Sequence, residues 1–451
     1  MERSLLELLT LPARPPGEAL LGLHRARPDR YPVLLESAAA GTPQGRYTLL
    51  LARPGDRLDA ADSSSRPGRL PRQDFLDRLD AAWQREALPR DEPGWPFTGG
   101  WFLFLGYELA GEVEPSLRLP PAPRDEASFA WRMRAAVVHD HRLGVTVAVA
   151  EQGESDFACQ VRADLGSLPR EAPQLPAAMP VEEEDPQRFL EAVRQALRHI
   201  AAGDVYQANL SRAWHATLPT GLPAADLYAR LRRSNPGPFA GIADFGTGAI
   251  VSSSPERLVR VCGRRVDTRP IAGTRPRYGP ADRRSIDQLV AHPKERAEHV
   301  MLIDLERNDL GRLCEPGTVV VDEMMSVESY AHVHHIVSNV GGRLRQDATP
   351  AAVIRAMFPG GTITGCPKVR CMQLIGELEG RGRGAYTGSM GYLGRDGDLD
   401  LNILIRTLSV HGRHATLRAG AGIVADSRPE RELEETRAKA RGVLRALEGG
   451  T

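Results

Sequence analysis

The stretch from Phe358 to Cys371, FPGGTITGCPKVRC, constrains the fold of this chain more than any other. Three glycines and two prolines interrupt it, and a basic, apolar run follows, which predicts a tight loop leading into a helix that Pro367 opens. Such a loop presents backbone N–H groups and hydroxyls at a helix N-terminus, where a carboxylate or phosphate binds well. An ordinary turn before a packing helix has the same residues, so the stretch alone does not establish a site.

The composition limits the classes of function. The 451 residues allow two or three domains or one large fold, and 41% hydrophobic residues suffice for a large core. Basic and acidic residues are balanced at 58 each, so bulk charge indicates neither a nucleic-acid nor a membrane partner. Five scattered cysteines, and no apolar run near the ~20 residues of a membrane span, favour a reduced cytoplasmic setting.

The pattern of apolar residues divides the chain into two parts. Residues 1–165 are predicted to be strand-rich, and the segment 166–184 carries prolines and an acidic run typical of a linker. The part from 185 to 451 opens with Asp185 and Pro186, a plausible N-cap and first helical residue, before a helical pattern that ends near Gly203. The strands expected in the first part are Tyr31–Ser37, Tyr47–Leu51, Trp101–Leu105 and a hairpin of Ala135–Val138 with Val145–Ala150.

Two acidic helices are expected to carry a metal site. Glu295 and Glu298 are three residues apart and therefore neighbours on one helix face. Glu432 and Glu435 repeat that spacing in a helix near the C-terminus, where the stretch from Ser427 resembles a capping box. Two such carboxylate pairs suit Mg²⁺, although Glu/Arg-rich helix faces are usually solvated.

Eight motifs follow one another along the chain in an order that resembles a known family. SSSPER, RPIAGTRPR, KERAEHVMLIDLERND, AHVHHIVS, FPGGTITGCPK, LIRT, GAGIVADS and ELEETRAKA follow one another from about Asp185 to Leu447. In this order they resemble the motifs of the chorismate-utilising enzymes, which include anthranilate, aminodeoxychorismate, isochorismate and salicylate synthases. The resemblance implies an α+β fold, with two large, mainly antiparallel sheets in a sandwich, helices outside and the active site between the sheets.

The resemblance also implies roles for matching residues. Glu298 and Glu435 match the main Mg²⁺ ligands, with Glu295 and Glu432 in support, so that the ion binds the ring carboxylate of chorismate. His335 matches a histidine beside the departing 4-hydroxyl, where an imidazolium acts as general acid. Glu256 and Lys439 match recurrent pocket positions. The residues that the resemblance expects to hold the enolpyruvyl carboxylate or to line the ring pocket are Tyr386, Arg406, Gly420, Ala421, Gly422, Thr362, Gly273 and Thr274.

Two positions bear on which reaction the chain catalyses. Family members that add water use a lysine as base where this chain has Gln207, so the two amine-forming reactions remain. Aminodeoxychorismate synthases of the best-known type have a catalytic lysine where this chain has Ala272, as in anthranilate synthase. GDVYQANL, with Asn209, and the FPGGTITGCPK and DLNILIRT stretches resemble aminodeoxychorismate synthase instead. We therefore expect aminodeoxychorismate synthase component I, by direct or otherwise rerouted amination, with anthranilate synthase component I as the alternative.

Further expectations concern partners. No Cys-His-Glu glutaminase module is visible, so a separate amidotransferase subunit is expected to supply ammonia. Leu35, Glu36, Ser37 and Tyr47 resemble the tryptophan pocket of anthranilate synthases, although a buried strand with a polar end explains the same residues. A non-catalytic scaffold that only binds ligand is the alternative of another class, which the retained carboxylate pairs, His335 and Arg406 disfavour.

Overall fold

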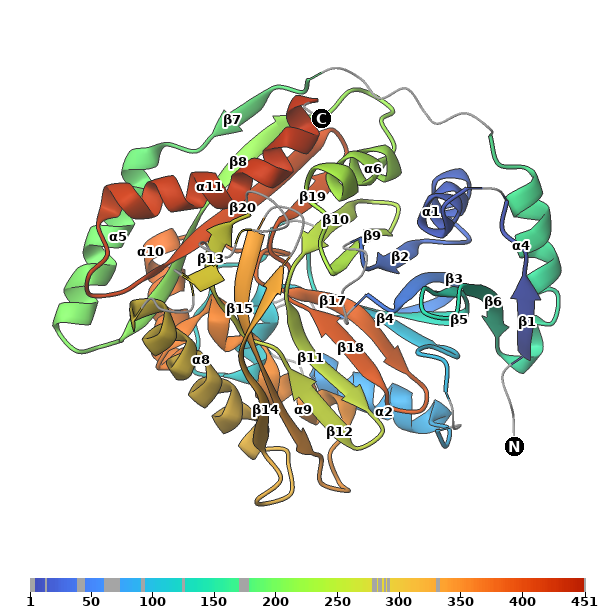
Figure 1. Ribbon diagram of the computed structural model, residues 1–451, viewed down its shortest axis with the longest axis horizontal. Coiled ribbons are helices and arrows are strands. Elements are labelled where there is room, and N and C mark those ends of the chain that lie inside the picture. The colour runs from blue at the N-terminus through green and yellow to red at the C-terminus, as the bar shows by residue number, and fades with distance from the viewer. Residues whose placement is uncertain are drawn as a thin grey trace, which may run out of the picture.

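The computed structural model describes residues 5–12, 14–38, 45–60, 74–90, 94–123, 126–169, 178–277, 282, 286–287, 289, 293–329 and 333–449. Every strand pairing within these ranges is antiparallel, and the strands form two long arms that meet at β5 (Phe129–Asp140). Figure 1 shows the arms as two sheets, with helices on their outer faces. The expected α+β fold is therefore confirmed, although β5 joins the two sheets into one hydrogen-bonded network.

The first arm runs from the N-terminal strands to the C-terminal hairpin. On one side of β5 lie β6 (Val145–Ala150) and then β1 (Leu5–Leu9). On the other side the order is β3 (Tyr47–Asp59), β2 (Val33–Glu36), β9 (Phe239–Asp244), β10 (Ala249–Ser254), β19 (Thr407–His411), β20 (His414–Ile423) and β8 (Gln207–Thr217). The far edge of β8 pairs with β7 (Val181–Glu183) and β16 (Gly365–Cys366).

The second arm also alternates between early and late parts of the chain. From β5 it continues through β4 (Gly100–Leu105), β17 (Ser389–Gly394), β18 (Leu399–Asn402), β11 (Arg257–Cys262), β12 (Arg265–Thr268) and β15 (Val333–Arg343). β13 (Ile271–Pro276) and β14 (Val320–Ser329) both pair with β15. Strands of 1–165 and of 185–451 therefore share both sheets, and the predicted division of the chain does not correspond to separate sheets.

Apolar side chains fill the space between the arms and bury the helices outside them. One cluster joins Leu51 and Ile250 of the first arm to Phe102 and Met390 of the second. The helices are α1 (Pro16–Ala26), α2 (Phe75–Glu86), α3 (Ala110–Val113), α4 (Phe157–Gly166), α5 (Pro186–Ala201), α6 (Ala224–Ser234), α8 (Pro293–Gly311), α9 (Pro350–Met357), α10 (Lys368–Glu379) and α11 (Pro429–Glu448). Short 3-10 turns are η1 (Tyr107–Leu109), η2 (Gln152–Glu154) and η3 (Gly361–Ile363). Within the described ranges, no helix is long and apolar enough to cross a lipid bilayer.

Local sequence signals account for the elements that were predicted. Asp185 accepts a hydrogen bond from the N–H of Gln187 at 3.0 Å and caps α5, as expected. The predicted hairpin is β5 with β6, and Pro367 directly precedes α10. One expectation was wrong: Ser427 accepts from the N–H of Val424 instead of capping α11. Of the predicted linker 166–184, residues 170–177 lie outside the described part of the chain, and the strand β7 lies near its end.

Candidate active site

The predicted site residues gather around the glycines at the end of β20. Gly420, Ala421 and Gly422 pair with Ser211, Leu210 and Asn209 of β8, and α10, α5 and α11 cover this part of the sheet. A Cβ at Gly420 would lie 2.6 Å from the Tyr386 hydroxyl oxygen and 2.7 Å from Asn209 Oδ1. A Cβ at Gly422 would lie 2.5 Å from Gln207 Nε2. Only glycine leaves room for these polar groups beside the strand.

Helices α8 and α11 bring carboxylates to this strand. Gln207 Nε2 donates to Glu298 Oε1 at 3.3 Å. On the other helix, Lys439 Nζ lies 2.7 Å from Glu435 and donates to the carbonyl oxygen of Gly420 at 3.1 Å. Glu298 is therefore linked to β8 through Gln207, and Glu435 is linked to the neighbouring strand β20 through Lys439.

The remaining two carboxylates of the predicted metal set are placed less fully. Glu432 is buried on α11, one turn before Glu435. Glu295 lies in α8, and its side chain is outside the described part of the chain, as is that of Thr274. Among the side chains described, no three His, Cys, Asp or Glu residues are gathered as a ready-made metal site. Partly open carboxylates suit a magnesium ion that keeps water and substrate oxygens, and do not suit an ion enclosed by protein alone.

Three buried serines hold the segment that carries Arg406. Ser252 Oγ lies 2.8 Å from Thr407 Oγ1, Ser253 Oγ donates to the carbonyl of Arg406, and Ser254 Oγ donates to that of Ile403. Arg406 has a φ of 53°, a left-handed conformation that costs energy for a residue with a side chain. The SSSPER motif thus fixes the backbone that presents this guanidinium.

Glu256 is a buried carboxyl within the same group. Thr362 Oγ1 donates to Glu256 Oε1 at 2.9 Å, and the backbone carbonyl of Glu256 accepts from the N–H of Ile403. Burial raises the pKa of Glu256 to about 7, although the Thr362 hydrogen bond and the charges of Arg406 and Lys439 lower it. A carboxyl with a pKa near neutrality is suited to donate and accept a proton.

His335 does not have the charge state that was expected. It is buried on β15, opposite Thr274 of β13, and Ala272 pairs with Ile336 beside it. Burial and the positive charge of Arg406 lower the pKa of His335 to about 3, despite a backbone hydrogen bond with Gly273. The ring is therefore neutral at pH 7 in the protein alone, and the general-acid role of His335 stays a prediction.

A second buried carboxyl near the ring pocket was missed from the sequence. Glu306 of α8 packs against Gly361, and burial, followed by the charge of Asp309, raises its pKa to about 8. Half-buried Lys368 forms an ion pair with buried Asp309. In the sequence Glu306 and Asp309 look like part of a solvated charged helix, and only the tertiary fold reveals that they are buried.

A buried cluster around Glu379, which the sequence analysis also missed, lies next to the site. The carboxylate of Glu379 accepts hydrogen bonds from Arg383, from Arg418 and from the N–H and hydroxyl of Ser211. Arg383 also donates to the carbonyl of Asn209 at 2.7 Å, and its guanidinium lies 5.4 Å from the centre of the Tyr386 ring. This buried cluster fixes both residues that face Gly420. Arg418, an arginine in the middle of a strand, was the one signal of this cluster in the sequence.

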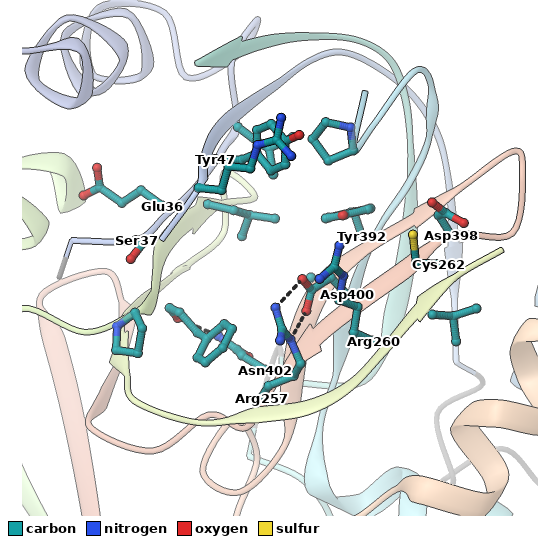
Figure 2. A pocket seen from close by; sticks show the side chains of 18 of the residues that line it. Glu36, Ser37, Tyr47, Arg257, Arg260, Cys262, Tyr392, Asp398, Asp400 and Asn402 are labelled. Carbon is teal, nitrogen blue, oxygen red and sulfur yellow. Dashed lines mark hydrogen bonds and ion pairs between the residues drawn. The ribbon is translucent and has the colours of Figure 1, made fainter. Parts of the chain in front are cut away.

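The four residues of the predicted tryptophan pocket line one cavity. Leu35, Glu36, Ser37 and Tyr47 border a space of about 350 Å³ between the two arms. Figure 2 shows Glu36, Ser37 and Tyr47 on one side and Arg257, bound to Asp400 at 2.9 and 3.0 Å, on the other. Glu36 is held by Tyr228 and Arg232 behind the wall. A cavity of this size is in the range of small-molecule sites, ~300–1,000 Å³.

Comparison with known proteins agrees with this geometry. Residues 32–445 match the family model described as chorismate binding enzyme. The chain belongs to the chorismate binding enzyme family. An anthranilate synthase component I-like protein of Synechocystis is 41% identical over 435 residues, which cover 92% of this chain and 86% of that protein.

Two further relatives show how the family members divide. An aminodeoxychorismate synthase of Streptomyces griseus is 38% identical over 97% of this chain, which spans 60% of that longer protein. The crystal structure of anthranilate synthase component I from Streptococcus pneumoniae is similar with a TM-score of 0.78 and 32% identity, over 90% of this chain and 93% of that one. The chain is thus a chorismate-utilising enzyme by family, and the relatives' names leave its product open.

Proposed function

We propose that the protein is aminodeoxychorismate synthase component I, which aminates chorismate with ammonia to 4-amino-4-deoxychorismate for 4-aminobenzoate and folate synthesis. The amide of Gln207 in contact with Glu298 supports amination over hydration. The resemblance of the GDVYQANL, FPGGTITGCPK and DLNILIRT stretches to aminodeoxychorismate synthase supports this product over anthranilate. A neutral amide cannot take a proton from water, so hydration of chorismate lacks a base at this point. Ammonia needs no such base, because its free-base fraction is already nucleophilic.

The enolpyruvyl carboxylate is assigned to the end of the site at Gly420. Arg406 offers two parallel N–H donors to a carboxylate, and the Tyr386 hydroxyl packs against Gly420. The backbone of Gly420, Ala421 and Gly422 approaches the substrate closely because the two glycines carry no side chain. Thr362, which is hydrogen-bonded to Glu256, and Gly273, whose backbone is hydrogen-bonded to His335, are assigned to the ring pocket.

Glu256 is assigned as the proton donor to the departing hydroxyl. As the C4–O bond breaks, the hydroxyl takes the proton of Glu256 and leaves as water, while the nitrogen of ammonia forms the new bond at C4. The nitrogen then returns one proton to the Glu256 carboxylate, which balances the step. Neutral His335 orients the substrate by hydrogen bonding, and Lys439 stabilises the carboxylate form of Glu256.

Magnesium is assigned to the opposite, ring-carboxylate end of the substrate. Glu298 and Glu435 would hold it, with Glu295 and Glu432 in support, and their partial exposure suits an ion that retains water. When bound, it supplies positive charge that balances the ring carboxylate in a buried site. Ammonia is assigned to a separate glutamine amidotransferase subunit, so the purified chain should not release glutamate from glutamine.

Anthranilate synthase component I is the second candidate. Ala272 stands in β13 where the best-known aminodeoxychorismate synthases use a lysine, and two of the relatives above are named for anthranilate synthase. In that reaction ammonia adds at C2 and the enolpyruvyl group leaves as pyruvate. The two candidates predict different products from the same substrates.

One incubation tests both candidates. Purified protein is mixed with chorismate, Mg²⁺ and ammonium, and the products are identified by mass and retention time. An amino-chorismate that a lyase converts to 4-aminobenzoate supports the proposal. Anthranilate with an equal amount of pyruvate refutes it in favour of the second candidate, and no turnover favours a scaffold that only binds ligand.

The cavity between the arms is assigned to tryptophan, as a structural or regulatory ligand. Tyr47, Phe239 and Tyr392 offer aromatic surface to an indole. Arg260 lines the cavity as well, and its guanidinium is a suitable donor for a carboxylate. Ser37 provides a hydroxyl on the opposite wall.

A further inference from the structure

Two neighbouring amide side chains on β8 each have an oxygen that lacks a hydrogen-bond partner in the described part of the structure. These atoms are Gln207 Oε1 and Asn209 Oδ1. The residues are 4% and 9% exposed, and because they are two positions apart on one strand, their side chains leave the same face. Buried polar atoms are nearly always hydrogen-bonded, so a pair of unpartnered acceptors indicates a ligand that brings donors.

Both side chains face the proposed substrate site. Gln207 contacts Glu298 at the assigned magnesium end, whereas Asn209 Oδ1 packs against Gly420, as does the Tyr386 hydroxyl. The ligand in question would therefore sit alongside the substrate, next to its ring.

The backbone holds these two side chains firmly. The N–H of Asn209 donates to the carbonyl of Thr364 at 2.9 Å, and its own carbonyl accepts from Arg383 at 2.7 Å. The carbonyl of Gln207 accepts from Cys371 Sγ at 2.9 Å. The unpartnered oxygens thus belong to a well-packed strand. Their lack of partners is not explained by a loosely packed surface segment.

We propose that the amide oxygens of Gln207 and Asn209 bind the ammonia that attacks chorismate, an inference that rests on the proposed function. Ammonia has three N–H donors, so it can bond to both oxygens and keep its lone pair for the ring carbon. The carboxylates of chorismate are acceptors and cannot satisfy these atoms. Amides also leave ammonia unprotonated, whereas a carboxylate there would favour ammonium, which has no lone pair.

The test is Asn209→Leu, which keeps the side-chain volume and removes the acceptor. We expect the KM for ammonium to rise about tenfold, which is about 1.4 kcal/mol. The KM for chorismate should change less than about twofold, and the melting temperature should not fall, because the lost oxygen had no partner in the protein.

Asn339→Leu is the matched control. Asn339 is buried to a similar extent, at 8% exposed, but its amide is bonded to Asp267, Asp322 and Arg269. This variant should melt at a lower temperature with an unchanged KM for ammonium. If Asn209→Leu aminates chorismate with the wild-type KM for ammonium, the inference is overturned and the proposed function stands. If wild-type protein forms no aminated product at all, both are overturned.

Discussion

Replacement of Glu379 by glutamine should destabilise the protein by leaving two buried guanidinium groups without a counter-charge. The wild-type carboxylate accepts from Arg383 at 2.6 and 3.1 Å, from Arg418 at 2.7 Å and from Ser211 at 2.8 and 2.9 Å. Removal of one partner from a buried ion pair costs about 3–5 kcal/mol. For a chain of 451 residues the unfolding entropy is about 0.9 kcal/mol per degree, so the melting temperature should fall by about 3–5 °C.

The pH dependence of this loss provides a second readout. Burial alone would raise the pKa of Glu379, but Arg383 and Arg418 lower it below its usual value of 4.5. A lowered pKa contributes stability above the unfolded value, and that stability is lost as the pH falls through the folded one. The melting temperatures of Glu379→Gln and wild type should therefore differ most near pH 7 and converge in acid.

Differential scanning fluorimetry from pH 3 to pH 8 measures this effect directly. Glu377→Gln, two residues earlier on α10, is the control, because that side chain is 61% exposed and should change the melting temperature by less than about 1 °C. If Glu379→Gln melts within 1 °C of wild type at pH 7, the two arginines do not depend on this carboxylate and the reasoning fails.

Three further predictions concern ligands. Glu298→Gln should abolish Mg²⁺-dependent turnover of chorismate, and full activity in that variant would discredit the metal assignment. Glu256→Gln should lower kcat by about 10²–10⁴-fold in a product assay. In wild type at saturating free ammonia, kcat should fall as the pH rises above about 7, since Glu256 must be protonated to act as the acid, and a kcat that still rises at pH 9 under these conditions would contradict this role. L-Tryptophan at 100 times its Kd should add about 2.7 kcal/mol of stability, seen as a rise in melting temperature. The variant Ser37→Phe, which fills the cavity, should remove this rise, and an equal rise in the variant would place tryptophan elsewhere.

Sequence reasoning succeeded where the signal is local. The capped helix α5 and the β5–β6 hairpin were predicted because spacing and turn residues within a few positions specify them. β7 was assigned to a linker because its residues are acidic, and it is a strand only through pairing with β8. Likewise, strands from distant parts of the chain pair with each other in both arms, and no local pattern reveals this pairing.

The same distinction applies to the candidate site. Motif order pointed to Glu298, Gln207, Glu256 and Thr362, and the structure brings them together in two contacting pairs. The state of His335 was not predictable, because its pKa depends on burial and on Arg406, 71 positions away in the chain. The carboxyl of Glu379 was missed for the same reason, since its arginine and serine partners come from different strands and loops.

One strand separates the proposed substrate site from the cavity between the arms. Glu256 precedes β11 and its carboxyl meets Thr362, whereas the next residue, Arg257, points the other way and binds Asp400 in the cavity between the arms. A shift of this backbone by a fraction of an ångström would therefore alter the proton donor and the neighbouring ion pair together. Substitutions that enlarge or fill one chamber should accordingly be assayed for their effect on the other, because neither can be re-engineered in isolation.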